Sequence, residues 1–393
     1  MKTPASSLSE PGKVDIKTWP AKFNQSEESV IVMKHAPSFY ITLVLFIQTP
    51  GIVMGQNSQL DATAKLMKEL TEAHGPTGSE EPVGKIVARH LQPLVSDIKV
   101  DGLGSIIGTK KGSSDSPRIM LAAHMDEVGF IVKTISPDGF IYTNPVGGWR
   151  DPVLLAQRWV IMTRKGPVVA VSGAKTTHVM SAEAKNRPVP QQDVFWDVGA
   201  RTREEAMETL GIQPGDPVAP ESPFQVMANG EFYMAKAWDD RVGLVLIIEA
   251  LKRLQGQKHP NMIMAVATTQ EEIGLRGAHT STALVEPDLG ISLEVGVASD
   301  YPGTSPKEAQ EALGKGPGIF LLDSSMIPSR KLKDFVVEVA RRQGIPIQFE
   351  VLTGYGEDGA EMQRYKGGRP SINLTVPTRY LHSHIGILSR KDF

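Results

Sequence analysis

The segment at residues 267–277 reads ATTQEEIGLRG and follows the apolar run NMIMAV at residues 261–266. That run is short enough for a buried strand, and the glycines after it indicate the turn that ends the strand. In open α/β sheets the carboxyl ends of strands form the ligand crevice. Two adjacent carboxylates raise each other's pKa unless a positive charge lies between them, and a metal ion can supply it. Glu271 and Glu272 are therefore candidates for metal binding and proton transfer, although the pair alone also fits a solvated acidic turn.

Composition limits the classes of function that the chain can have. A length of 393 residues predicts two lobes, each large enough for its own core. A net charge of −2 without any block of Lys or Arg argues against binding to nucleic acid. The absence of cysteine excludes disulfides, thiolate nucleophiles and cysteine-based metal sites. Any metal ion must therefore be held by His, Asp and Glu.

The first 56 residues are predicted to be a disordered extension followed by a signal peptide. Residues 1–32 are polar and without periodicity, so they are disordered or not part of the natural protein. From Met33 the sequence has the pattern of a signal peptide: basic residues, then an apolar core, then small or tolerated residues at the boundary. This pattern predicts cleavage after Gly55. The apolar run is too short, and too interrupted by Pro50, to span a membrane. This interpretation makes the protein periplasmic or secreted; the alternative, a buried N-terminal strand, makes it cytoplasmic.

A second candidate group closes the apolar run at residues 118–123, which ends on His124, Met125 and Asp126. Alternation along an extended chain places His124 and Asp126 on the same side. A histidine whose second ring nitrogen is fixed by a nearby carboxylate is well prepared to bind a metal ion. A buried core histidine is the simpler reading of His124 alone, but the acidic cluster at the end of a strand favours a ligand.

Two further groups of acids lie at or inside predicted elements. Asp239 and Asp240 precede a helical pattern at residues 242–254, where they could cap the helix or offer a carboxylate that bridges two cations. Glu294 lies inside the apolar run at residues 289–296, where an unpaired carboxylate is costly and a cation partner is favoured.

The sequence pattern between residues 134 and 232 differs from that of the flanking segments. Short β-rich runs separated by Gly and Pro predict a small barrel or sandwich. We therefore predict an inserted β-rich domain at 134–232, and an α/β domain with a mixed sheet formed by 57–133 and 233–393. His178, inside the insert, is interpreted as a structural or interface residue.

Together, five motifs resemble the dinuclear-metal aminopeptidases of the glutamyl-aminopeptidase and tetrahedral-aminopeptidase group, whose members are also often labelled cellulases. The resemblance runs from about Leu60 to the end of the chain. The motifs are AHMDEVG at 123–129, AWDDRVG at 237–243, QEEIGLRG at 270–277, LE at 293–294 and RYLHS at 379–383. Each motif is moderately specific, and all five in this order are highly specific.

The resemblance assigns a role to each matching residue. It implies metal ligands at His124, Asp239, Glu272, Glu294 and His382, with Asp239 as the bridge. It also implies catalytic roles for Glu271, as the general base, and for Asp126, as the residue that supports the first histidine. Many relatives have Asp where this chain has Glu294, and the longer side chain still reaches a cation.

The same resemblance implies a fold, a reaction and partners. The fold is an α/β/α sandwich with a mixed sheet, carrying a small β-rich barrel that drives dimerisation, and the dimers assemble into a dodecamer. The expected reaction is hydrolysis of N-terminal residues from peptides, with two divalent ions (Zn, possibly Co or Mn) activating a shared water and one ion holding the free α-amino group.

Two other classes of function stay open at this point. A glycosidase also uses paired carboxylates, but it needs no histidine ligands and survives chelators. A catalytically altered relative acting as an assembly or binding module would keep the fold while losing ligands. All five ligand positions hold residues that can bind a metal ion, which favours the enzyme.

Overall fold

The computed structural model describes residues 60–393; the predicted signal peptide and the extension before it lie outside this range. The helices and strands occupy the following residues: α1 Ala62–Glu72, α2 Glu81–Leu91, β1 Asp97–Val100, β2 Ile106–Lys110, β3 Arg118–His124, β4 Gly129–Ile135, β5 Ile141–Val146, β6 Arg158–Thr163, β7 Gly166–Gly173, β8 Phe195–Asp197, β9 Pro217–Pro220, β10 Gln225–Val226, β11 Phe232–Ala235, α3 Trp238–Arg253, β12 Met262–Thr268, α4 Arg276–Val285, β13 Leu289–Val297, β14 Gly318–Leu322, α5 Arg330–Gln343, β15 Gln348–Val351, α6 Gly359–Arg364, β16 Ser371–Arg379 and β17 Gly386–Ser389. Among these residues no helix is long and apolar enough to cross a membrane.

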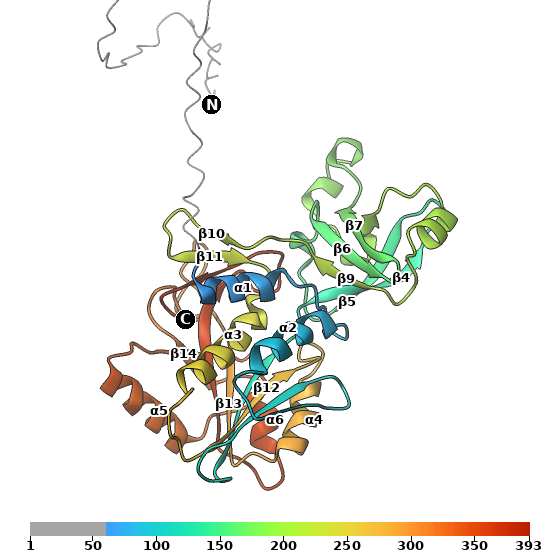
Figure 1. Ribbon diagram of the computed structural model, residues 1–393. Coiled ribbons are helices and arrows are strands. Elements are labelled where there is room, and N and C mark those ends of the chain that lie inside the picture. The colour runs from blue at the N-terminus through green and yellow to red at the C-terminus, as the bar shows by residue number, and fades with distance from the viewer. Residues whose placement is uncertain (1–59) are drawn as a thin grey trace, which may run out of the picture. The chain divides into compact units, whose positions relative to one another are not determined.

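A mixed sheet of eleven strands forms the larger part of the molecule (Figure 1). Strands β12, β3, β13 and β16 lie next to one another in that order and run parallel. Antiparallel strands extend the sheet on both sides of this parallel centre. Parallel strands must be buried on both faces, which explains the continuous apolar runs that the sequence shows for β3 and β12.

Two hydrophobic cores cover the two faces of the sheet. Residues of α1, α2 and α3 pack together with Ala265 and Ala267 of β12 on one face. On the other face, Val285 of α4 and Met362 of α6 pack against Met264 of the same strand. Alternate residues of one strand therefore enter different cores, as the period of two requires. The predicted α/β/α sandwich with a mixed sheet is confirmed.

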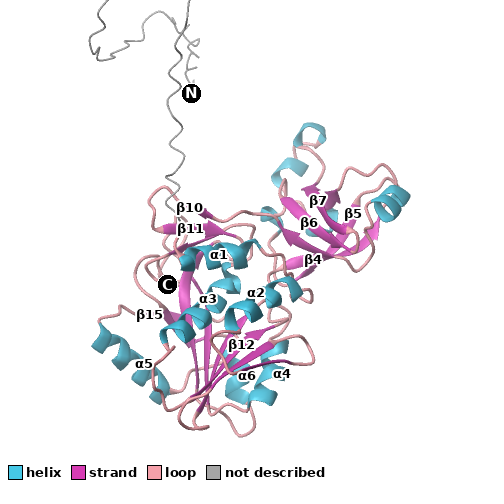
Figure 2. Ribbon diagram, viewed as in Figure 1, coloured by secondary structure: helices cyan, strands magenta, loops and turns pink. Residues whose placement is uncertain are grey.

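The second part is a closed antiparallel barrel with the strand order β4, β5, β8, β7, β6, β9 (Figure 2). Its interior is filled by aromatic side chains, among them Phe130, Trp159 and Trp196, all of which are buried. The predicted small barrel is confirmed. Its strands run from Gly129 to Pro220, whereas β10 and β11 pair within the large sheet. The division at residues 134 and 232 stays a prediction.

The parallel centre of the sheet splits where the candidate residues gather. Strands β3 and β13 pair only from Leu289 to Ser292, whereas β13 stays paired with β16 as far as Val297. The beginning of α3 lies at this split, because a Cβ added to Gly243 would come 2.3 Å from the carbonyl oxygen of Leu293. No residue with a side chain could replace this glycine without moving the helix.

Candidate functional site

The structure brings the candidate residues together from five elements. His124 ends β3, and Glu271 and Glu272 follow β12. Glu294 lies within β13 beyond the point where the strand leaves β3. Asp239 lies at the start of α3, and His382 lies in the loop after β16. The parallel strands thus carry these residues to one end of the sheet, the usual position of a ligand site in this class of fold.

The two carboxylate oxygens of Asp239 face two different histidines. Its Oδ1 lies 2.8 Å from Nε2 of His124, and its Oδ2 lies 3.3 Å from Nε2 of His382. Each histidine also faces a glutamate: Oε1 of Glu294 is 3.2 Å from His124, and Oε2 of Glu272 is 3.5 Å from His382. The site therefore has two halves, each with one histidine and one glutamate, and Asp239 is shared between them.

Atoms that could bind a cation lie close together, and two of the carboxylate oxygens among these residues have no hydrogen-bond partner. Potential ligand atoms of His124, Asp239 and Glu272 lie within 4.8 Å of one another. Those of His124, Asp240 and Glu294 do the same. One carboxylate oxygen of Glu272 and one of Glu294 are buried without any hydrogen-bond partner. Imidazole nitrogens and carboxylate oxygens are the donors that Zn, Co and Mn accept, so this set fits such ions.

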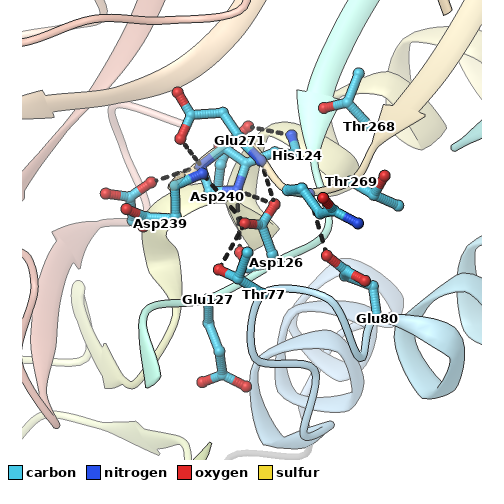
Figure 3. Close-up of polar contacts among 12 residues, drawn as sticks. Thr77, Glu80, His124, Asp126, Glu127, Asp239, Asp240, Thr268, Thr269 and Glu271 are labelled. Atoms are coloured by element: carbon cyan, nitrogen blue, oxygen red, sulfur yellow. Dashed lines mark hydrogen bonds and ion pairs between the residues drawn. The ribbon is translucent and has the colours of Figure 1, made fainter. Parts of the chain in front are cut away.

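Asp126 orders the site without facing the shared carboxylate (Figure 3). Its side chain accepts hydrogen bonds from the backbone N–H groups of Glu271 at 3.0 Å and of Glu272 at 3.2 Å. It also accepts one from the hydroxyl of Thr77 at 2.9 Å. Its carbonyl oxygen lies 3.0 Å from Nδ1 of His124, which leaves Nε2 free to face Asp239. Asp126 is fully buried and links the β3 end of the site to the turn after β12.

Asp240 occupies a position that a neighbouring strand would otherwise take. Its Oδ2 accepts the backbone N–H of His124 at 3.2 Å, and its Oδ1 accepts that of Gly243 at 3.0 Å. The first of these bonds forms where β3 no longer pairs with β13. Asp240 therefore replaces the missing strand partner and fixes the start of α3 beside His124.

Burial and mutual repulsion dominate the electrostatics of the site. Burial raises the pKa of Glu271 well above its usual value, with the charges of Glu272 and Glu294 adding to the effect and that of His124 opposing it. Burial likewise raises the pKa of Glu272 to about 8. For His382, burial lowers the pKa, but the nearby carboxylates outweigh it and the result is about 9. Without a cation, protons would therefore balance these charges, and a bound cation would displace them.

Solvent reaches the site unevenly. The side chain of His382 is 34% exposed, whereas that of His124 is 2% exposed. Asp239, Glu271 and Glu294 are all buried. A substrate can therefore approach from the side of His382, while His124 forms the inner wall.

Two buried groups beside the site were not identified from the sequence. Glu357 and Asp358 lie before α6; both oxygens of Glu357 lack a partner, and Asp358 accepts a hydrogen bond of 2.6 Å from the hydroxyl of Thr268. The sequence shows only an acidic loop there, and the adjacent acids were the one available signal. The charges of Glu294 and Glu271 act on Glu357, in addition to its burial, and all three raise its pKa.

The other group is a buried ion-pair network around Glu127. Both carboxylate oxygens of Glu127 lie 2.6 Å from Nζ of Lys236, and one lies 3.4 Å from the guanidinium of Arg241. The two cations also donate hydrogen bonds to the carbonyl of Ala73 at the end of α1. The network holds the segment that carries Thr77, which in turn bonds to Asp126. The sequence gives no sign of this network, because Glu127 is more than a hundred residues away from Lys236 and Arg241.

Comparison with known proteins places this arrangement in a family. The model of the M42 glutamyl aminopeptidase family matches residues 104–393. A glutamyl aminopeptidase of Lactococcus lactis subsp. cremoris is 35% identical over 330 residues, covering 83% of this chain and 91% of that protein.

Solved structures agree. The TET aminopeptidase from the marine sediment archaeon Thaumarchaeota archaeon SCGC AB-539-E09 has 45% identity and a TM-score of 0.82, covering 84% of this chain and 92% of that one. The TET1 peptidase of Pyrococcus horikoshii, which can assemble into a tetrahedron or a large octahedral shell, has 32% identity and a TM-score of 0.76, covering 84% and 96%. The family model spans most of the chain, and it agrees with the sandwich, the inserted barrel and the site at the ends of parallel strands. The chain therefore belongs to the M42 glutamyl aminopeptidase family.

Proposed function

We propose that this protein is a metal-dependent aminopeptidase with a two-cation site, in which Asp239 bridges two ions. The observation that carries the proposal is the placement of the two oxygens of Asp239 opposite two different histidines, each accompanied by its own glutamate. His124 and Glu294 would hold one ion, and His382 and Glu272 the other. Two divalent cations bound there would lower the pKa of a water and polarise the scissile carbonyl.

Glu271 is the proposed general base. Its carboxylate oxygen lies 3.8 Å from Nε2 of His124, and Glu271 is not itself needed as a ligand. A carboxylate in this position can accept a proton from the attacking water and deliver it to the nitrogen of the leaving amine. Burial raises its pKa, which favours proton acceptance, and bound cations would offset part of that rise.

Asp126 is proposed to position these residues and not to touch the substrate. Its side-chain oxygens are occupied by the backbone of Glu271 and Glu272 and by Thr77. Holding the general base and a ligand through their main-chain groups leaves both side chains free for chemistry. The orientation of His124 by the carbonyl of Asp126 has the same effect on the other wall of the site.

Substrate assays on the metal-loaded protein test this function. We expect peptides with a free N-terminus to be cleaved after the first residue, and the same peptides with an acetylated N-terminus to resist. A chelator should abolish cleavage, and Zn, Co or Mn should restore it. Hydrolysis of a β-glucan that persists in chelator would overturn the proposal in favour of the glycosidase. Two bound ions without any cleavage of peptides would favour the altered relative that acts as a binding module.

We further propose that the protein is a homo-oligomer in which the barrel forms the dimer contact and dimers build a dodecamer. The support is that the TET1 peptidase of Pyrococcus horikoshii can assemble into a tetrahedron or a large octahedral shell. Light scattering coupled to size-exclusion chromatography decides the matter: a particle with the 42.7 kDa mass of one chain would contradict the proposal.

A further inference from the structure

The loop that carries His382 has a backbone that must be held in place by its surroundings. Residues 380–385 join β16 to β17, and two of them adopt positive φ angles: Tyr380 at 62° and His382 at 53°. This left-handed region is strained for a residue with a side chain. Such a loop keeps its shape only where other contacts determine it.

One set of contacts comes from the barrel through His384. This side chain is buried, and its Nε2–H donates a hydrogen bond of 3.0 Å to the carbonyl oxygen of Arg158 in β6. Its ring packs edge-on against Trp159, with 4.3 Å between ring centroids, and lies 5.7 Å from Trp149. We call Trp149, Trp159 and His384 the aromatic clamp. It fastens the loop of His382 to the barrel wall.

The other set comes through the segment before Trp149. The backbone of Gly148 lies against the imidazole of His382, because a Cβ added to Gly148 would lie 3.0 Å from Nδ1 of that ring. A Cβ added to Gly147 would lie 3.2 Å from Oε2 of Glu272. This glycine pair thus touches both side chains of the His382 half of the site. Trp149 continues the same segment into the clamp.

The His124 half is supported differently. Asp126 fixes its ring through a carbonyl, and Asp240 accepts its backbone N–H. Both of these residues belong to the sandwich, and neither is part of the barrel. The ring of His124 is therefore held by the sandwich alone, whereas the ring of His382 is also supported from the barrel.

We propose that the aromatic clamp is a positioning device for one half of the site, so that the barrel sets the affinity for the ion held by His382 and Glu272. The proposal rests on the two-cation site proposed above. It assigns His384 a role through His382, without contact with substrate. The ion held by His124 and Glu294 should not depend on it.

The test measures the affinity for each of two Zn²⁺ ions by competition with a chromophoric chelator, on the full chain. Two substitutions separate the contacts of His384. His384→Phe keeps a ring against Trp159 but loses the donor to Arg158, and we expect one of the two ions to bind about 10- to 100-fold more weakly while the other is unchanged. His384→Gln keeps a donor, so its loss should be smaller.

Trp196→Phe is the matched control. Trp196 lies in the barrel core with its ring centroid 5.6 Å from that of Trp159, and it makes no ring contact with His384 among the described residues. This variant should lower the melting temperature and leave both ion affinities at the wild-type value. If it weakens one ion as much as His384→Phe does, the effect is general damage to the barrel and the proposal fails.

Other outcomes also decide the matter. Equal weakening of both ions, or unchanged affinities with a lower melting temperature, would make His384 a packing residue and overturn the proposal. If His384→Phe does not fold, His384→Gln and Trp149→Phe give the same readout. If the wild type binds two ions but cleaves no peptide with a free N-terminus, only the proposed function is contradicted, because the role of the aromatic clamp is tested by ion affinity. A wild-type chain that binds neither ion would contradict both the proposed function and the proposed role of the clamp.

Discussion

The carboxylate of Asp126 accepts the backbone N–H of Glu271 at 3.0 Å, across 145 positions of sequence. One buried side chain thus sets the place of the proposed general base through its main chain. Replacing Asp126 by Asn exchanges an acceptor oxygen for a donor, and that donor would oppose the N–H of Glu271 or Glu272.

For Asp126→Asn we therefore expect metal affinity and kcat/KM to fall together by about 10- to 100-fold. Thr77→Val is the control, because it removes only the hydroxyl that donates to Asp126 at 2.9 Å and should have a smaller effect. Metal titration and initial rates check both variants. Wild-type values in Asp126→Asn would show that Asp126 does not position the site.

Replacing Glu271 by Gln should leave both ions bound and lower kcat by roughly 10²–10⁴-fold, because the amide fills the same space without accepting a proton. Metal analysis of the purified variant accompanies the rate measurement. Loss of one ion from this variant would make Glu271 a ligand, and another group would have to accept the proton.

The shared position of Asp239 makes a separate prediction. Asp239→Asn should lower the occupancy of both halves, because each oxygen of the carboxylate faces one histidine, at 2.8 Å and 3.3 Å. Zinc content per chain, measured at several concentrations of free zinc, reports the two sites. Normal binding in one half and loss in the other would identify Asp239 as a terminal ligand of a single ion.

A pH effect on stability is predicted for Glu311, which lies away from the proposed ligands. Burial raises its pKa to about 8, opposed by the hydrogen bond that it accepts from Thr375 at 2.6 Å. The folded chain therefore holds this proton up to a higher pH than the unfolded chain does. The free energy of unfolding is highest below about pH 4.5, where both states are protonated, and it falls as the pH rises towards 8.

Glu311→Gln removes this titration while keeping an acceptor for Thr375. The free energy of unfolding of this variant, relative to that of the wild type, should increase between pH 5 and 8 by on the order of 3 kcal/mol. Urea denaturation across this range measures the difference between the two proteins. A constant difference across the range would mean that Glu311 is ionised in the folded protein at neutral pH.

The N-terminal prediction concerns residues outside the described range. We expect translation to start at Met33 and export to remove the chain up to Gly55, because a basic start precedes an apolar core and a small-residue boundary. Mass spectrometry of the mature N-terminus, after expression from Met33 in the native cells, measures the cleavage point. A cytoplasmic product that retains Phe39 would contradict export and favour a buried role for the apolar run.

Motif order and strand patterning predicted the sandwich, the barrel and the general position of Glu271 at the end of β12. Local periodicity, which a single sequence carries, predicts the strands and helices, and the resemblance of the motifs adds how they are layered and that the insert is a barrel. Neither predicts the supports of the site: Glu127 finds Lys236 and Arg241 more than a hundred residues away. Such pairs depend on how the elements pack.

Some site residues could be predicted from the sequence for a different reason, the cost of burying a charge. An acid such as Glu294 inside an apolar strand needs a partner, and this need is visible without a structure. Glu357 gave no comparable signal, because its loop also contains glycine and tyrosine and reads as exposed turn. In the structure Glu357 is instead fully buried, and its burial and the charge of Glu294 both raise its pKa.

The split between β3 and β13 bears on which ions the site can accept. Because α3 begins at this split, with Gly243 against the carbonyl of Leu293, main-chain contacts set the gap between His124 and Glu294. Rotamer changes alone can adjust that gap only slightly. The choice among ions of different radius should therefore depend on strand separation as much as on ligand identity, and residues with no polar side chain can tune it.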